Sequence, residues 1–289
     1  MLVAVPLAGC AGGAAPTHKD PSTFTDQDVR DLVATAVNNV ATASSFTGNL
    51  FTASDYASRA DSGLQPTSSS LNATMVADRT NGRAEITLKI SVSTAEMEGA
   101  VQTINADTFL YSDYLYVTMT DLAGAQWFKL PVTDTVLDVF SARVIDNEIA
   151  MFNEPAEVSY LRNEEYDGAD CYVLQIVPNN DELLKNLQRQ QPQGVDIDWS
   201  KLDDVSKLYE NDTYLVWIET DTVRIVKARN QFTVNFGIDA FADDPVLSGI
   251  YLSSSSFVTL THYNEKVIIN LPEAAQEAIE VSPDNITGQ

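Results

Sequence analysis

Apolar residues recur along this chain at two different spacings, and each spacing predicts a different element. In residues 25–41 they return every three or four positions, as Val29, Leu32, Val33 and Ala36 show. This period predicts a helix with one apolar face. Thr25 and Asp28 form the pattern of a capping box, which places the helix start at this point. A helix of this kind needs an apolar layer on which to lie.

From residue 45 to residue 130 the apolar period changes to two. Short runs rich in β-branched and aromatic residues alternate with Gly, Asn, Asp and Ser, which predicts an antiparallel meander of strands. Asn81-Gly82 and Ser112-Asp113 predict tight hairpin turns. The polar stretch 58–70 has the composition of a surface loop.

The second half of the chain mixes both spacings. Residues 133–147 return to a helical period, and Asp167-Gly168 predicts a type I′ turn between two strands. A helix is expected from Asn180, with acidic residues in its first turn, where the helix dipole favours them. Further strands are expected near 213–235 and 250–263. Helices inserted among antiparallel strands indicate an α+β fold and argue against alternating βαβ units.

The N-terminus carries a processing signal. Leu7-Ala8-Gly9-Cys10 has the form of a lipobox, in which Cys10 becomes the lipidated first residue of the mature protein. Residues 1–9 contain no Lys or Arg, so they are expected to be the remnant of a signal peptide whose start lies upstream. Residues 10–24 predict a flexible tether because they are rich in Gly, Ala and Pro. Residues 25–289 are expected to form a single domain.

The charge and the apolar content of the chain exclude some classes of protein. The chain has 41 acidic and 17 basic residues, a formal net charge of −24. This excess of negative charge would repel nucleic acid. No segment has the roughly 20 apolar residues that a membrane-spanning helix requires. We therefore expect an extracytoplasmic protein that is held at the cell membrane through Cys10, where two acyl chains suffice for stable anchoring.

The sequence contains no pattern that indicates a catalyst. Its two histidines, His18 and His262, lie in the tether and near a strand end, so a Ser/His/Asp constellation is not expected. Cys171 lies within a strand and is expected to be a small buried hydrophobe. The acidic segment containing Asp196, Asp198, Asp203 and Asp204 lacks the glycine and terminal glutamate of a calcium loop, and we interpret it as helix capping. No enzyme activity, cofactor or metal is predicted.

The order of these elements resembles the carrier fold of the LolA-type lipoprotein-sorting proteins and the LppX/LprG-type lipoproteins. The stretches that carry the resemblance are the lipobox at Cys10, the helix at 25–41, Tyr114–Val117, Trp127–Lys129, Tyr166–Gly168, Cys171–Leu174 and Thr213–Ile218. The resemblance implies a strongly curved antiparallel sheet, an open half-barrel, with helices covering its concave side. It also implies a hydrophobic ligand held between the sheet and its helices.

The strand periods supply candidates for the ligand-binding face. On the hairpin at Asp167-Gly168 one face carries Tyr172, Leu174 and Ile176, and the other carries Cys171, Val173 and Val177. We expect the first of these faces to point inward. The full set of predicted ligand-binding residues is Leu115, Val117, Met119, Phe128, Leu130, Tyr172, Leu174, Ile176, Tyr214, Val216 and Ile218.

Two functions remain open from the sequence. In the first, the half-barrel binds or carries a lipid or another amphiphile without catalysis. In the second, the same residues fill a closed core, and the protein is a structural lipoprotein that contacts another envelope protein. The volume left between sheet and helices distinguishes these alternatives. A hydrolase that uses paired carboxylates is a third hypothesis, which would require a polar cleft with converging acids.

Overall fold

The structure is a computed structural model of the whole chain. It describes residues 20–60, 63–94, 100–121, 124–133, 136, 144–190, 197–237, 243 and 249–282. Cys10 and most of the predicted tether lie outside these residues, as does most of the helix expected at 133–147.

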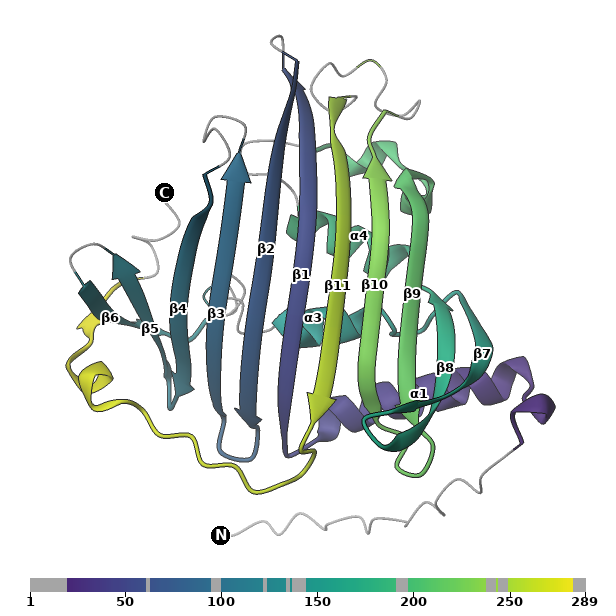
Figure 1. Cartoon of the computed structure of the whole chain (residues 1–289), viewed down its shortest axis with the longest axis horizontal. Coiled ribbons are helices and arrows are strands. Elements are labelled where there is room, and N and C mark those ends of the chain that lie inside the picture. The colour runs from purple at the N-terminus through teal and green to yellow at the C-terminus, as the bar shows by residue number, and fades with distance from the viewer. Residues whose placement is uncertain are drawn as a thin grey trace, which may run out of the picture.

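The described chain forms one large sheet and a small number of helices (Figure 1). The helices are α1 (Asp26–Thr42), α3 (Val144–Ala150) and α4 (Asn180–Gln190), with 3-10 turns at Pro21–Thr23, Trp199–Lys201, Val205–Leu208 and Glu273–Glu277. The strands are β1 (Ser45–Ala60), β2 (Gly63–Asp78), β3 (Arg83–Thr94), β4 (Gln102–Tyr111), β5 (Tyr114–Asp121), β6 (Gly124–Pro131), β7 (Glu157–Tyr166), β8 (Ala169–Val177), β9 (Tyr209–Glu219), β10 (Ile225–Asn235), β11 (Tyr251–Thr261) and β12 (Ile279–Glu280).

Two meanders meet in the middle of the sheet. The strand order is β12-β6-β5-β4-β3-β2-β1-β11-β10-β9-β8-β7, and every pair is antiparallel except the short β12–β6 pair. β1 and β11, which are far apart in the sequence, pair from Thr47–Thr261 to Ala57–Tyr251. The connection between β6 and β7 runs from one edge of the sheet to the opposite edge, and α3 lies on this connection. The sheet is open, as the predicted half-barrel class requires.

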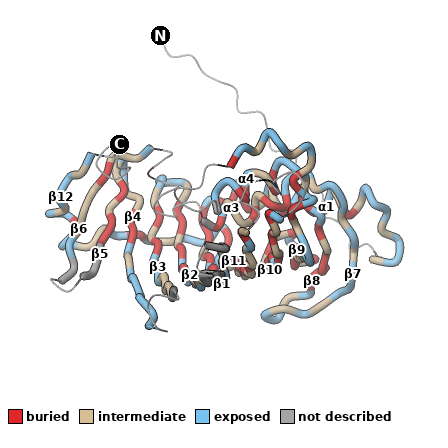
Figure 2. The backbone as a smooth tube through the Cα atoms, turned by 90° about the horizontal axis from the view of Figure 1, so that it is seen from above, coloured by how far each residue is buried: buried red, intermediate tan, exposed pale blue. Residues whose placement is uncertain are grey.

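The helices cover one side of the sheet. Viewed along the strands, α1, α3 and α4 lie on the concave side, and buried residues concentrate between them and β8–β11 (Figure 2). The α1 residues Val29, Val33, Ala36 and Val40 are buried and belong to the main core. The capping box of Thr25 and Asp28 is present, as predicted.

The prediction of a surface loop at 58–70 is wrong, because most of this stretch belongs to strands. β1 extends to Ala60 and β2 begins at Gly63, and their register runs from Ala60–Gly63 through Ala53–Ser70 to Ser45–Asp78. The stretch is rich in Ser and Thr, which gave it the composition of a loop. Backbone pairing to a neighbouring strand can define a strand without an apolar period, since strand preference depends strongly on context.

Candidate functional site

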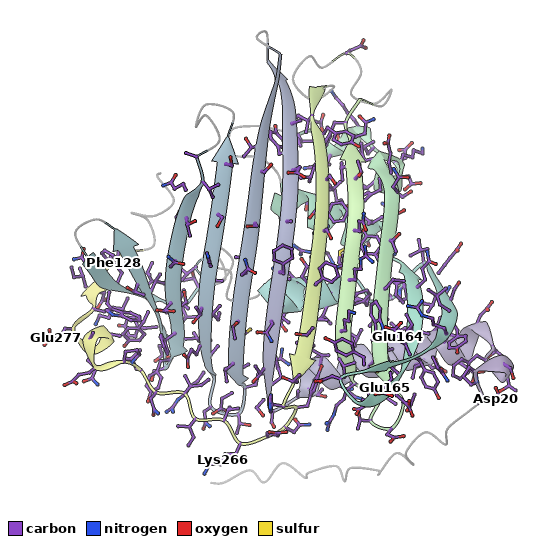
Figure 3. All side chains as sticks on the ribbon, in the orientation of Figure 1. Asp20, Phe128, Glu164, Glu165, Lys266 and Glu277 are labelled. Atoms are coloured by element: carbon purple, nitrogen blue, oxygen red, sulfur yellow. The ribbon has the colours of Figure 1, made fainter. Side chains whose placement is uncertain are left out.

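The structure places most of the predicted ligand-binding residues deep in the main core. Nine of the eleven are buried on the concave side of the sheet, and Leu174, Val216 and Ile218 have no exposed surface at all. Phe128 is half-buried on β6, near one edge of the sheet (Figure 3). The side chain of Met119 lies outside the described residues. The inward faces of the strands are therefore as predicted, while the binding of a ligand stays a prediction.

The opposite face of the Asp167-Gly168 hairpin is also partly buried. Cys171 and Val173 form a second, small cluster with Trp217 on the convex side of the sheet. Trp217 Nε1 donates to Glu164 at 3.1 Å, and the Lys227 ammonium lies 4.3 Å from the Trp217 ring centroid. Burial raises the pKa of the Cys171 thiol to about 11, so it is a poor nucleophile.

One transverse row of side chains crosses the concave face of nine strands. Its members are direct register partners from strand to strand, so all of them point to the same face. From β7 to β4 the row consists of Val158, Ile176, Tyr214, Asn230, Ser256, Thr52, Leu71, Ile90 and Ile104. It is apolar at both ends and polar in the middle.

A buried carboxyl group lies over the polar middle of this row. Glu148, on α3, accepts hydrogen bonds on the same oxygen, Oε2, from Asn230 Nδ2 at 2.6 Å and from Ser256 Oγ at 2.8 Å. The residue as a whole is half-buried, but its carboxyl group is turned away from solvent toward these strands. Burial raises the pKa of Glu148 above its ordinary value, and the hydrogen bonds from Ser256 and Asn230 oppose this rise only in part.

Two polar atoms of the row have no hydrogen-bond partner within the described part of the chain. They are Asn230 Oδ1 and the Tyr214 hydroxyl, and their side chains belong to residues that are only 2% and 1% exposed. Glu148 is close enough to Tyr214 that its charge contributes to the raised pKa of the phenol, whose main cause is burial. Buried polar groups without partners are uncommon and need an explanation.

Toward β4 the row becomes exposed. Thr52, Leu71 and Ile90 are half-buried, and Ile104 is 45% exposed. These side chains continue the concave face from the buried polar middle toward solvent. The row therefore runs from a hydrogen-bonding centre beneath α3 to an apolar, accessible end.

Arg79, from the β2–β3 hairpin, joins two of the helices that cover this centre. Its guanidinium donates to the carbonyl groups of Val40 and Ala41 at the end of α1, and it pairs with Asp146 at 2.7 Å in the first turn of α3. A cation is favourable at a helix C-terminus, and an anion is favourable at an N-terminus. This one side chain thus links the end of α1 to the start of α3.

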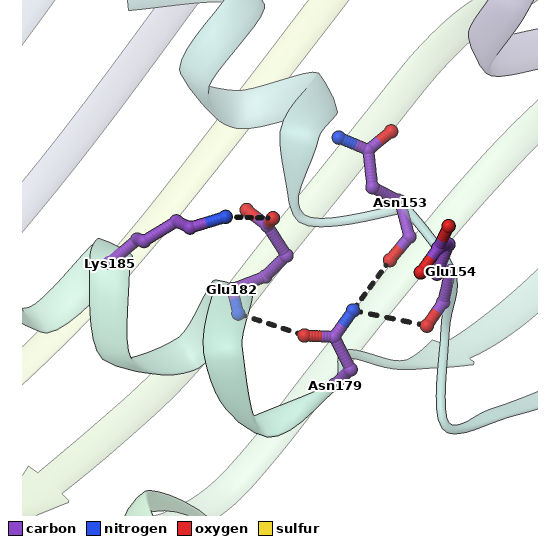
Figure 4. Close-up of polar contacts among 5 residues, drawn as sticks. All are labelled: Asn153, Glu154, Asn179, Glu182 and Lys185. Atoms are coloured by element: carbon purple, nitrogen blue, oxygen red, sulfur yellow. Dashed lines mark hydrogen bonds and ion pairs between the residues drawn. The ribbon is translucent and has the colours of Figure 1, made fainter.

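Asn179 holds the other end of α3. Its Oδ1 accepts from the backbone N–H of Glu182 and so caps α4, while its Nδ2 donates to the carbonyl groups of Asn153 and Glu154 in the loop after α3 (Figure 4). Glu182 also pairs with Lys185 at 2.8 Å. Together, the contacts of Asn179 and those of Arg79 help to determine where Glu148 lies.

The acidic segment after α4 makes local caps where the structure describes it. Asp198 and Asp204 accept from the backbone N–H of Ser200 and Ser206 at the starts of two 3-10 turns. Within the described residues, no group of three or more His, Cys, Asp or Glu side chains could hold a metal ion. Of the described helices, none has the length and apolar character needed to cross a bilayer.

Sequence reasoning missed the polar centre altogether. Glu148 is one acidic residue among many, and Asn230 and Ser256 lie more than 80 residues from it in the chain. One signal was available: Asn230 interrupts the apolar alternation of Ala228, Phe232 and Val234 in β10. A polar residue at an inward position indicates a buried partner.

Comparisons with known proteins find similarity only at the level of solved structures. No family model matches the chain, and no curated protein matches it. Similar structures include the lipoprotein LppX of Mycobacterium tuberculosis, with 12% identity, a TM-score of 0.41 and coverage of 85% of this chain and 100% of that one. LprF of Mycobacterium bovis gives 9% identity, a TM-score of 0.44 and coverage of 85% and 97%.

A putative outer membrane lipoprotein-sorting protein domain from Vibrio parahaemolyticus gives 8% identity, a TM-score of 0.24 and coverage of 92% and 100%. These are the kinds of lipoprotein that the sequence was expected to resemble. At these identities and TM-scores the likeness assigns no ligand, anchor or partner to this chain.

Proposed function

We propose that this protein is a membrane-anchored, extracytoplasmic lipoprotein that binds a lipid or another amphiphile on the concave face of its half-barrel. The observation that carries the proposal is the row that ends at Ile104. Leu71, Ile90 and Ile104 are apolar, lie on the same face as the core and remain partly exposed. Apolar side chains in a concave surface beside a few polar groups are typical of sites for small amphiphiles.

The dimensions of the row suit an acyl chain. Ser256 and Ile104 are separated by four strand spacings, about 19 Å at roughly 4.8 Å per spacing. One leaflet of a bilayer contributes about 15 Å of hydrocarbon. A single acyl chain laid across β1–β4 would thus span most of the distance from the polar centre to the exposed end.

The proposed anchor is Cys10, which would keep this face near a supply of lipid. The chain carries one other thiol, Cys171, which is buried. Expression of the full chain behind a complete signal peptide in a lipoprotein-processing host should add the mass of the lipid to the N-terminal peptide. Cys10→Ser should abolish this addition, while the control Cys171→Ser should retain it. Unmodified Cys10 in such a host would contradict the anchor.

Ligand binding is tested by a substitution on each face of the sheet. Ile104 on the concave face and Phe51 on the convex face are similarly exposed, at 45% and 40%. We expect Ile104→Asp to weaken the binding of a fluorescent acyl probe by about tenfold or more, because it places a charge against the chain. Phe51→Asp should leave binding within about twofold. Equal effects, or no probe binding by the wild-type protein, would overturn the proposal.

One observation favours the alternative of a structural lipoprotein with a closed core. Nine of the eleven predicted ligand-binding residues, on β5, β6, β8 and β9, are buried in the main core, so most of their surface is packed against other side chains. If the probe does not bind and the protein copurifies without lipid from its membrane, the closed-core alternative is the better one.

A further inference from the structure

The unpartnered polar atoms at the centre of the row suggest what kind of amphiphile binds. This inference rests on the proposed function, because it assumes that an acyl chain lies along the open end of the row. The geometry points to recognition of an uncharged, hydroxyl-bearing headgroup by Asn230, Tyr214 and Glu148, with the acyl chain directed toward Ile104.

Two groups of the polar centre, the Asn230 amide oxygen and the Tyr214 hydroxyl, can form further hydrogen bonds to a ligand. Asn230 already uses its Nδ2 on Glu148, and no donor to its Oδ1 is found in the described part of the chain. Among the residues that the structure describes, the Tyr214 hydroxyl has no partner, so it can serve as both donor and acceptor. A ligand hydroxyl group can donate to the amide oxygen and accept from the phenol, so it can satisfy both buried atoms at once.

The charges around the centre disfavour an anionic headgroup. The carboxyl group of Glu148 is buried, and its two hydrogen-bond partners, Asn230 and Ser256, are neutral. The one cation whose charge affects its pKa is Arg189, an exposed residue of α4. A phosphate or carboxylate headgroup would have to be desolvated beside a carboxyl group, and the hydrogen-bond partners of that group among the described residues are uncharged.

The centre lies next to the part of the row that opens to solvent. Thr52 follows Ser256 directly in the row, and Leu71 and Ile90 come next. Ser54 and Ser254, whose hydroxyl groups lie 3.1 Å apart, extend the polar surface beside this path on β1 and β11. A headgroup at Asn230 thus leaves its chain on the side of the sheet where exposure increases.

Access to the centre requires a modest movement of α3. This helix has seven residues, and its Arg79–Asp146 ion pair is partly exposed, so the pair adds little to its attachment. α3 also places Ile145 and Ile149 in the main core, so the binding of a ligand has to compensate for any of this packing that is lost when the helix moves.

The experiment compares ligands of one chain length on the full-length protein. A monoacylglycerol and an alkyl glucoside supply uncharged hydroxyl groups from two sources, while a fatty acid and a fatty amine supply charges. Affinities are measured by displacement of the fluorescent acyl probe below the concentration at which micelles form. We expect at least one hydroxyl ligand to bind about tenfold more tightly than either charged ligand, the equivalent of one well-made hydrogen bond.

Tyr214→Phe separates recognition from structure. It removes a hydroxyl group that has no partner within the described residues, so the melting temperature should stay constant or rise. The preference for the hydroxyl ligand should fall about tenfold. In the matched control, Tyr209→Phe removes a hydroxyl group that donates to the Leu183 carbonyl at 3.2 Å. This control should lower stability and leave the ligand preference unchanged.

The outcomes are distinguishable from failure of the proposed function. If the wild-type protein binds none of the four ligands, the proposed function fails. If it binds them with equal affinity, prefers a charged ligand, or keeps its preference in Tyr214→Phe, only the assignment of the headgroup site is overturned.

Discussion

The two halves of the concave face differ in what covers them. Over β8–β11 the inward residues lie beneath α1, α3 and α4, and Leu174, Val216 and Ile218 are inaccessible to solvent. Over β2–β4 the same row of the sheet ends in Ile104, which is 45% exposed. The inward face of β2–β4 is buried at Met75, Ile86 and Leu88, and its exposure is confined to the part around Leu71, Ile90 and Ile104, which is the open half of the row. One continuous sheet thus combines a packed core, which supplies stability, with an exposed end of the row, which can supply a binding surface.

An apolar pattern does not distinguish a buried core position from an exposed position on the same face of the sheet. Nine of the eleven predicted ligand-binding residues are buried, on β5, β6, β8 and β9, where burial contributes to folding. The residues better placed to contact a ligand, Leu71, Ile90 and Ile104, are apolar residues of the first meander. Periodicity identifies the inward face of a strand, but the cover over that face depends on helices distant in sequence.

The largest expected effect is a difference in stability between the two halves. Leu174→Ala should lower the free energy of unfolding by about 2–5 kcal/mol, because it leaves a cavity in a fully buried site. Ile104→Ala should change it by less than about 0.5 kcal/mol while weakening acyl-probe binding. Chemical denaturation of both variants checks the comparison, and equal losses of stability would contradict the division into halves.

A second prediction concerns the contact between α3 and the sheet. At Gly48 an added Cβ would overlap Ile145 Cδ1 on α3 and crowd Leu260 Cδ2. Gly48→Val should therefore destabilise the protein by about 1–3 kcal/mol through overpacking, as measured by urea denaturation. Gly82→Ala is a control with open space around it, although its positive φ adds a strain of its own. A Gly48→Val protein as stable as the wild type would show that α3 lies farther from β1.

The buried carboxyl group of Glu148 predicts that the stability of the protein depends on pH. Burial raises the pKa of Glu148 in the folded protein above its ordinary value of 4.5, so the folded state holds this proton more tightly than the unfolded state. Its contribution to stability is fully present below pH 4.5 and is lost as the pH rises through the folded-state pKa.

Glu148→Gln keeps the acceptor oxygen and removes this titration. The difference in unfolding free energy between Glu148→Gln and the wild type should therefore grow in favour of the variant as the pH rises above 4.5. Urea denaturation across this range measures it, with Glu154→Gln as a control at an exposed position after α3. A difference that does not vary with pH would mean that Glu148 is solvated.

The smallest effect is expected at the ion pair that holds α3. Asp146→Asn should cost less than about 1 kcal/mol, because the side chains of Arg79 and Asp146 are 28% and 45% exposed. The loss, measured by denaturation at two ionic strengths, should shrink in high salt. A larger loss that is insensitive to salt would indicate that the pair is desolvated.

The sequence predicted those features of the fold that depend on neighbouring residues, such as the hairpin turns. Asp167 and Gly168 both have positive φ, as the predicted type I′ turn requires, and Ser112 has the positive φ of the second predicted hairpin. At Asn81-Gly82 the turn is longer than predicted, spanning residues 79–82, and Asp78 accepts from the backbone and side chain of Asn81 within it. The position of a hairpin is thus local information, while its length depends on side-chain contacts.

The polar centre could not be predicted, because it is assembled by topology. α3 lies on the connection between the two edges of the sheet. The pairing of β1 with β11 is what brings Ser256 beside Thr52. None of these long-range contacts can be recognised from the spacing of apolar residues along the sequence. Asn230 alone gave a hint, as a polar residue at an inward position of β10.

The proposed binding surface is tested most directly by photo-crosslinking with an acyl chain that carries a diazirine at its far end, followed by mass spectrometry of peptides. The chain should label concave-face positions of β2–β4, at Leu71, Ile90 or Ile104, and Ile104→Asp should remove the label. Labelling confined to the convex face around Phe51, or no specific labelling, would contradict a binding surface on the open half of the sheet.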